Sequence, residues 1–463
     1  MRYSLTLSHV VLWGGLCASA IFTMKSTLAH SAAPVVVKPN MARQQAQTVR
    51  IKPKPSGPKQ VFILQPPQNK KLPQDPSQVT ISANVEGRIC YTFLGKYSPE
   101  MDTFRTGLVI INRQRVDTVV KQFLTSYAGV QNALDNYSPK LSPQEKYVLF
   151  KAGSTGSAYN PYFLYVLDVN TSKVFEAANS VNYSATSWAP TLNYIALVEK
   201  GDLGGYTDRL GEYIGTRSLY VQNWRTQKKQ LVAVNDSVTE PFTWIGNTLL
   251  YSLFPNKEDD PKAEQNANVY QFDVATGQSR LLIADAYRAV ASPSGKRLVF
   301  FGLENPKLFK GSSERWLNNL SLIVSSADGS NRTALDRADP MQQLLWRDER
   351  FLMTLAQEHK GINTTARLRE WDTQKQTFRD LVVLRAQEYS DVPRPSVNPV
   401  FSLLRSSRDA SKILVKRVEY TGLNKQGFLK NRTSILAVDI KTGNVNTPIV
   451  AEDVSGLDWV ENK

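Results

Sequence analysis

The segment Ala291-Ser292-Pro293-Ser294-Gly295-Lys296-Arg297-Leu298-Val299-Phe300 decides the fold of this chain. Proline and glycine favour a tight turn, and the run Leu-Val-Phe that follows is typical of a buried strand. A second apolar run at 320–324 and the turn Ala327-Asp328-Gly329 come next. This order predicts short antiparallel strands joined by tight turns.

The same order of elements recurs along the chain. Trp188-Ala189-Pro190 precedes apolar runs at 194–197 and 219–221, and Leu141-Ser142-Pro143 precedes runs at 147–150 and 164–168. A repeat of 47 to 60 residues that holds four short strands is typical of a β-propeller blade. One residue marks each unit: Leu141, Trp188, Trp244, Ala291, Trp346, Ser406 and Trp459.

The two ends of the repeat region complement each other. The last unit stops after its first strand, around Trp459, whereas the region 88–120 holds three apolar runs with no first strand before them. Pairing these segments would close the ring and remove two exposed sheet edges. The sequence therefore predicts an all-β fold, a seven-bladed propeller over residues 84–463 closed by its C-terminal strand.

Residues 292–300, together with Leu-Tyr-Val-x-Asp at 164–168 and Thr-Gly at 276–277, resemble the WD-repeat-like unit of the TolB family of bacterial periplasmic propellers. The resemblance covers about residues 84–460. It implies a periplasmic protein that works in an envelope complex with a peptidoglycan-associated lipoprotein. Members of that family carry an α/β domain before a six-bladed propeller, and here a basic, proline-rich stretch stands in its place.

The first residues have the pattern of an export signal. Arg2 precedes a short apolar run at 10–22, and Ala18-Ser19-Ala20 or Ala29-His30-Ser31 offers small residues for cleavage. Residues 1–32 are therefore expected to direct the chain to the periplasm or the cell exterior. The alternative is an uncleaved N-terminal membrane anchor.

Residues 33–83 are expected to form a disordered linker, because proline and glutamine dominate them. Much of the net charge of +15 lies here, with Asp75 as the only acidic residue. Such a stretch suits a spacer, and peripheral contact with anionic lipids or polymers is the alternative. The basic residues are Lys38, Arg43, Arg50, Lys52, Lys54, Lys59, Lys70 and Lys71.

Long connections are expected on one face of the propeller. They fall at 95–106, 201–216, 255–267, 303–319 and 421–432 between second and third strands, and at 122–135 and 385–398 between blades. Loops on a rigid scaffold commonly carry binding residues. Aromatic and basic side chains in two of them are the candidate ligand-binding residues, with packing between loops as the alternative: Tyr206, Arg209, Tyr213, Arg315 and Trp316.

Several turns between third and fourth strands follow an aspartate. An aspartate at this place accepts hydrogen bonds from the next backbone N–H groups, so we interpret it as a turn cap and not a site. The four examples are Asp168, Asp273, Asp372 and Asp439.

No catalytic motif, cofactor or metal site is predicted. Once the leader is removed, His359 is the only histidine and Cys90 the only cysteine, and neither has the setting of a general base or a nucleophile. Glu258-Asp259-Asp260 lacks the alternating oxygen ligands of a calcium loop. We expect a monomeric binding or scaffold protein that engages an envelope protein, polysaccharide or peptidoglycan and no nucleic acid. The alternative is a propeller glycoside hydrolase or lyase that uses carboxylates on one face.

Overall fold

The computed structural model describes an all-β protein of 32 strands, with no helix among the described residues. Consequently no helix in the described part is long and apolar enough to cross a membrane. Residues 1–59, which include the predicted leader, lie outside it. The described residues are 60–63, 79–81, 87–98, 103–112, 115–126, 139–153, 162–171, 173–178, 183–200, 206–207, 213–214, 217–234, 238–253, 267–304, 319–337, 342–360, 363–387, 400–423, 429–452 and 454–460.

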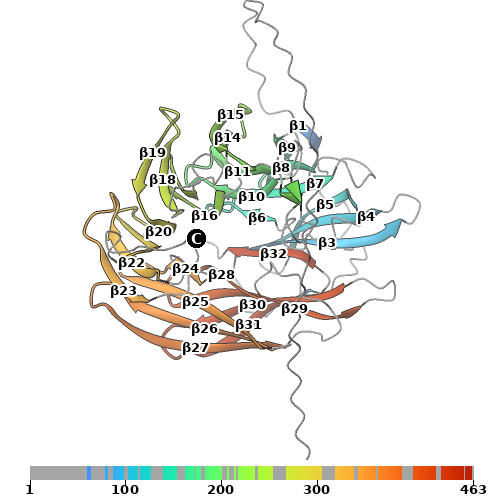
Figure 1. Ribbon diagram of the computed structural model, residues 1–463. Coiled ribbons are helices and arrows are strands. Elements are labelled where there is room, and N and C mark those ends of the chain that lie inside the picture. The colour runs from blue at the N-terminus through green and yellow to red at the C-terminus, as the bar shows by residue number, and fades with distance from the viewer. Residues whose placement is uncertain are drawn as a thin grey trace, which may run out of the picture. The chain divides into compact units, whose positions relative to one another are not determined.

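Four sheets have four antiparallel strands each, hydrogen-bonded in chain order. Figure 1 shows their first strands near the centre of the propeller and their fourth strands outside. The strands are β10 (Tyr183–Trp188), β11 (Tyr194–Lys200), β14 (Arg217–Asn223) and β15 (Lys228–Val234); β16 (Val238–Ile245), β17 (Thr248–Leu253), β18 (Asn268–Asp273) and β19 (Gln278–Ile283); β20 (Ala286–Ala291), β21 (Arg297–Gly302), β22 (Ser321–Ser326) and β23 (Thr333–Arg337); and β24 (Gln343–Trp346), β25 (Phe351–Lys360), β26 (Asn363–Asp372) and β27 (Thr377–Gln387).

A fifth sheet has the order β2-β31-β30-β29-β28, so a strand from the N-terminal region covers its outer edge. Its strands are β2 (Val79–Ile81), β28 (Phe401–Ser406), β29 (Lys412–Leu423), β30 (Leu429–Asp439) and β31 (Val445–Glu452).

The sixth sheet has nine strands and corrects the predicted blade number from seven to six. Two strand groups predicted as separate blades form one sheet, because β5 pairs with β7 through Leu124 and Gly153. The predicted inner strand of the second group is short, since β6 has only two residues. The strands are β1 (Gln60–Ile63), β3 (Arg88–Ser98), β4 (Thr103–Asn112), β5 (Arg115–Ser126), β6 (Lys140–Leu141), β7 (Tyr147–Gly153), β8 (Tyr162–Asp168), β9 (Lys173–Ala178) and β32 (Val454–Val460).

The predicted closure is confirmed. β32 pairs with β3, and Trp459 lies opposite Ile89 (Figure 1). Asp458 reinforces this junction, because its carboxylate accepts hydrogen bonds from Arg405 Nη2 of β28 at 2.7 Å and from the Leu141 backbone N–H of β6 at 2.9 Å. The last strand is thus tied to β28 of the neighbouring sheet and to β6 of its own sheet.

The predicted linker over 33–83 is wrong in two places. β1 pairs with β9, and β2 pairs with β31. Both β9 and β31 would otherwise be outer edges with unpaired backbone groups, and these short runs, Val-Phe-Ile and Val-Thr-Ile, satisfy them. The rest of that stretch lies outside the described residues.

Hydrophobic side chains fill the space between neighbouring sheets. The cluster most relevant below joins Phe301 and Leu322 of the β20–β23 sheet to Trp346, Leu352 and Trp371 of the β24–β27 sheet. A second cluster lies within the nine-stranded sheet, where Cys90 and Leu108 cluster with Val148 and Phe150.

The segment 291–300 folds as predicted, with a turn between β20 and β21. Gly295 has φ of +72°, and its N–H donates to the Ser292 carbonyl at 2.8 Å. A Cβ at Gly295 would lie 2.5 Å from Ile245 Cγ2 of the preceding sheet. Glycine is required here both for its backbone conformation and for the contact between sheets.

The predicted separation of long and short connections holds only in part, because the end of the strands with the long connections also carries the short links 361–362 and 284–285. First-to-second and third-to-fourth links are tight, as between β26 and β27. Two links predicted to be long are shorter, because β3 extends to Ser98 before β4 begins at Thr103, and β29 extends to Leu423 before β30 begins at Leu429. Residues 201–216 carry a separate hairpin of β12 (Tyr206–Thr207) and β13 (Tyr213–Ile214).

Candidate functional site

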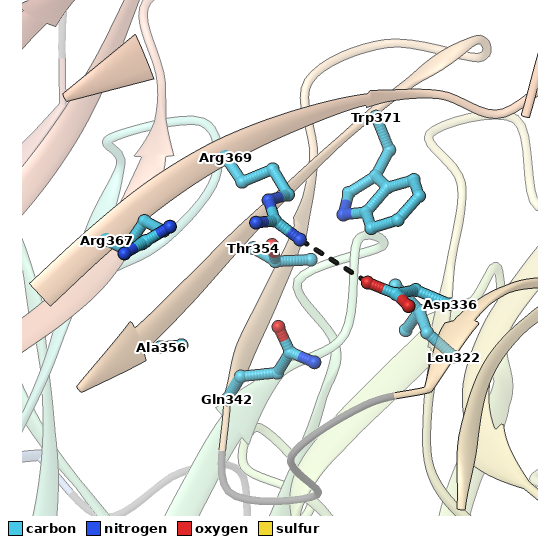
Figure 2. Close-up of a pocket in the computed structure, with 8 residues that line it drawn as sticks. All are labelled: Leu322, Asp336, Gln342, Thr354, Ala356, Arg367, Arg369 and Trp371. Carbon is cyan, nitrogen blue, oxygen red and sulfur yellow. Dashed lines mark hydrogen bonds and ion pairs between the residues drawn. The ribbon is translucent and has the colours of Figure 1, made fainter. Parts of the chain in front are cut away.

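A pocket of about 150 Å³ lies between the β20–β23 and β24–β27 sheets, and we call it the inter-blade pocket. Figure 2 shows side chains from both sheets around it. On the first sheet, Leu322 is the second residue of β22, just after the 303–320 connection, and Asp336 is the last residue but one of β23. On the second sheet, the lining residues of β25 and β26 belong to a hairpin closed by the pair Lys360 and Asn363. The lining residues are Leu322, Asp336, Gln342, Thr354, Ala356, Arg367, Arg369 and Trp371.

Strand register explains why a space exists here. On β25 and β26, Thr354 lies opposite Arg369 and Ala356 lies opposite Arg367. At the next pair on the same face, closer to the turn that follows β26, Leu352 lies opposite Trp371. Both side chains belong to the hydrophobic cluster that fills the gap between the sheets. The side chains shrink from leucine to threonine and alanine along β25, so packing ends and the pocket begins.

Four charged side chains form a chain of ion pairs at the rim. Arg369 Nε donates to Asp380 Oδ1 of β27 at 2.8 Å, and Arg367 Nη1 donates to Asp380 Oδ2 at 3.1 Å. Across the gap, Arg369 Nη1 reaches Asp336 Oδ2 at 3.4 Å, a contact drawn in Figure 2. Two guanidinium and two carboxylate groups balance, so the rim carries no net formal charge.

Asp380 is held ionised. Partial burial alone would raise the pKa of its carboxyl, but the hydrogen bonds and charges of Arg369 and Arg367 outweigh this and lower the pKa below its ordinary value. A carboxylate with a lowered pKa is a poor proton donor at neutral pH. Asp380 therefore does not suit the general acid of a glycosidase.

Aromatic rings hold Arg369 in place. Its guanidinium carbon lies 3.7 Å from the Phe378 ring centroid, and the Phe378 and Trp371 centroids are 4.7 Å apart. Stacked in this way, Arg369 is a fixed group and not a freely moving one. The position of the donors at this rim is therefore set before any ligand arrives.

Trp371 is 2% exposed, and its Nε1 has no hydrogen-bond partner among the described residues. Figure 2 shows this nitrogen on the side of the ring that faces Arg369 and Thr354. A buried N–H without an acceptor costs about 1–3 kcal/mol. By contrast, the indole N–H of Trp346 donates to the Val290 carbonyl at 3.0 Å, which is a purely structural bond.

Of the residues predicted for ligand binding, only Tyr206 and Tyr213 are described, and neither lines the inter-blade pocket. Tyr206 and Tyr213 are on β12 and β13, where Tyr206 pairs with Ile214 and Thr207 with Tyr213. In this register the two tyrosines belong to adjacent residue pairs of one hairpin. Their role in ligand binding stays a prediction. Arg209, Arg315 and Trp316 lie outside the described residues.

The pocket residues were missed from the sequence, although one signal was present. In Arg367-Leu368-Arg369 two arginines flank a leucine on a strand with sheets on both sides. Charged side chains at alternate positions of such a strand point to a polar cavity between sheets. The neighbouring blade that these charged side chains face can be identified only once the ring of blades is assembled.

The remaining titratable candidates do not gather into a site. His359 is exposed, and its Nδ1 lies 2.7 Å from Thr364 Oγ1. No cluster of three or more metal-ligating side chains occurs among the described residues. Cys90 is fully buried. Burial is the main cause that raises the pKa of its thiol, and the negative charge of Asp458 adds to it.

Comparisons with known proteins return similarity in structure only. No family model matches the chain, and no curated protein matches its sequence. Oligogalacturonate lyase from Vibrio parahaemolyticus aligns with a TM-score of 0.43 at 11% identity, over 80% of this chain and 84% of the lyase. The β-propeller domain of the Trilobed protease from Pyrococcus furiosus gives 0.46 at 12% identity, over 80% of this chain and 97% of that domain.

TolB from Acinetobacter baumannii is also among the similar structures, with a TM-score of 0.40 at 12% identity over 81% of this chain and 83% of TolB. TolB, a lyase and a protease domain thus share this likeness, so it does not choose between activities. The chain is a β-propeller by its own sheets and closure, with TolB and other propeller proteins among its structural neighbours.

Proposed function

We propose that this chain is an exported, non-catalytic binding protein of the bacterial cell envelope, which holds a protein or glycan partner at the face carrying its longer connections. The basic stretch before the propeller would add peripheral contact with anionic envelope surfaces, and the chain would act as a monomer. The leader-like pattern at 1–32 supports export.

The observation that carries the proposal is the inter-blade pocket, which lies towards that face. Its lining combines apolar side chains with polar groups fixed by ion pairs and ring stacking, as ligand sites commonly do. The same residues offer little to catalysis. Arginines neutralise both carboxylates at the rim, and Asp380 stays ionised.

Two matched substitutions test the proposal. Ala356→Leu fills the pocket, whereas Ala275→Leu adds the same bulk on the exposed tight turn between β18 and β19. Wild-type and variant full-length proteins would be incubated with envelope polysaccharide and envelope protein fractions, and the retained material quantified. We expect Ala356→Leu to lose most of the retained material, with Ala275→Leu equal to the wild type.

The same experiment distinguishes binding from catalysis. Retained glycan should be recovered at its original chain length. Equal retention by all three proteins would place binding elsewhere and reject the proposal. Shortened glycan in the wild-type sample alone would identify a hydrolase or lyase instead.

A further inference from the structure

The charge balance of the inter-blade pocket restricts its ligand. Arg367, Arg369, Asp336 and Asp380 are all engaged in ion pairs with one another. An acidic or basic ligand would bring an unbalanced charge to a site that already sums to zero, and a charge removed from water without a partner is costly. A neutral ligand avoids this cost.

The rim offers both kinds of hydrogen-bonding group. Arg367 can only donate, Asp336 can only accept when ionised, and the Gln342 amide and Thr354 hydroxyl can do both. These groups surround one small volume (Figure 2). A ligand that matches them must donate and accept from adjacent atoms, as hydroxyl groups do.

Part of the pocket lining is apolar. Leu322, Ala356 and Trp371 form this part, and Leu322 and Trp371 are nearly fully buried. A sugar ring has this pairing of surfaces, since its C–H face packs on apolar or aromatic side chains while its hydroxyls reach the rim. A peptide carboxylate or ammonium group has no such apolar face.

Building on the proposed binding function, we infer that the inter-blade pocket takes a neutral sugar residue of a glycan. The hydroxyls of that residue contact Asp336, Gln342 and Arg367, and its ring lies over Ala356 and Leu322. The indole N–H of Trp371, which has no partner among the described residues, donates a hydrogen bond to an oxygen atom of the bound sugar.

The test uses full-length protein and defined probes. Maltotriose, cellotriose and tri-N-acetylchitotriose are the neutral probes, and a triuronic acid and a glutamate-rich peptide are the charged ones. Calorimetric titration should show binding of a neutral trisaccharide, weakened at least about tenfold by Ala356→Leu and unchanged by Ala275→Leu. Asp336→Asn leaves a net positive rim, so it should weaken the neutral probe and strengthen the triuronic acid.

A second readout keeps the test independent of variant stability. In protein labelled with ¹⁵N-tryptophan, the indole signal missing from Trp371→Phe identifies Trp371. We expect this signal to shift on saturation with the neutral trisaccharide that binds. A bound sugar that leaves it unmoved contradicts the assignment.

The outcomes separate this inference from the proposed function. Ala356-dependent binding of only the triuronic acid or the peptide would overturn the neutral-sugar assignment. The proposed binding function of this face would still be supported. Absence of binding by every neutral probe would also overturn the assignment. Unchanged envelope retention by Ala356→Leu would overturn both.

Discussion

Single aspartates cap the turns between third and fourth strands, as the sequence predicts. Asp273 Oδ1 accepts from the backbone N–H groups of Ala275 and Thr276 at 2.8 and 2.9 Å. Equivalent pairs of bonds form at Asp168, Asp372 and Asp439. This role was predictable because it depends on neighbours two and three positions away.

Aspartates that accept hydrogen bonds within tight turns give the protein a specific acid sensitivity. At Asp409, in the turn between β28 and β29, hydrogen bonds from the Ser407 side chain and from Ser411 lower the pKa to about 2. The unfolded value is about 3.9, so the stabilisation is complete above that pH and is lost as the pH falls towards 2. The same direction holds for Asp273 and Asp439.

We predict that Asp409→Asn lowers the urea midpoint at pH 7 and that the difference from the wild type shrinks below pH 3. At low pH the wild-type carboxyl is protonated and loses the same charge-assisted bonds. Unfolding followed by tryptophan fluorescence at pH 7, 4, 3 and 2 measures this. A difference that stays constant across these pH values would contradict it.

At the scale of elements, strands and tight turns were predicted well, and pairing was predicted less well. The repeat identifies each apolar run, but two groups join into one sheet through β5 and β7, a contact with no local signal. Likewise, β1 and β2 sit in a proline-rich stretch whose composition favours disorder. Their partners, the outer edges of β9 and β31, exist only in the folded ring.

Removing these added strands should expose two edges. We predict that a protein lacking residues 1–83 self-associates as its concentration rises, because β9 and β31 then present unpaired backbone groups. Sedimentation velocity over a range of concentrations measures this.

A protein lacking only residues 1–53 is the matched control, since it keeps β1 and β2 and should remain at constant size. If both truncated proteins sediment alike, edge protection is not the role of these strands.

For the whole molecule, closure was predictable and the pocket was not. The incomplete first and last units of the repeat are enough to imply the pairing of Ile89 with Trp459. The inter-blade pocket depends on Ala356 and Asp336, which belong to different sheets and meet only through the stacking of one blade on the next. Sequence patterns describe each sheet but not the space between two of them.

Cys90 provides a probe of closure, because it lies on β3 beside β32 and is fully buried. In a Cys17→Ser variant it is the sole thiol. We predict that Cys90 reacts with a thiol reagent only at the rate of global unfolding, since its thiol is inaccessible and its pKa is raised.

Labelling rates across a series of urea concentrations, compared with unfolding rates from tryptophan fluorescence, test this. Labelling that outpaces unfolding would show that β32 detaches from an otherwise intact ring.

The pairing of β3 with β32 also bears on the fate of incomplete chains. A ribosome that stalls before Val454 releases a product in which β3 keeps β4 but lacks its other neighbour, β32, so that one edge of β3 is exposed. Such a product carries the exposed strand that proteases and chaperones recognise. We therefore expect chains that lack β32 to be degraded faster than chains that contain it.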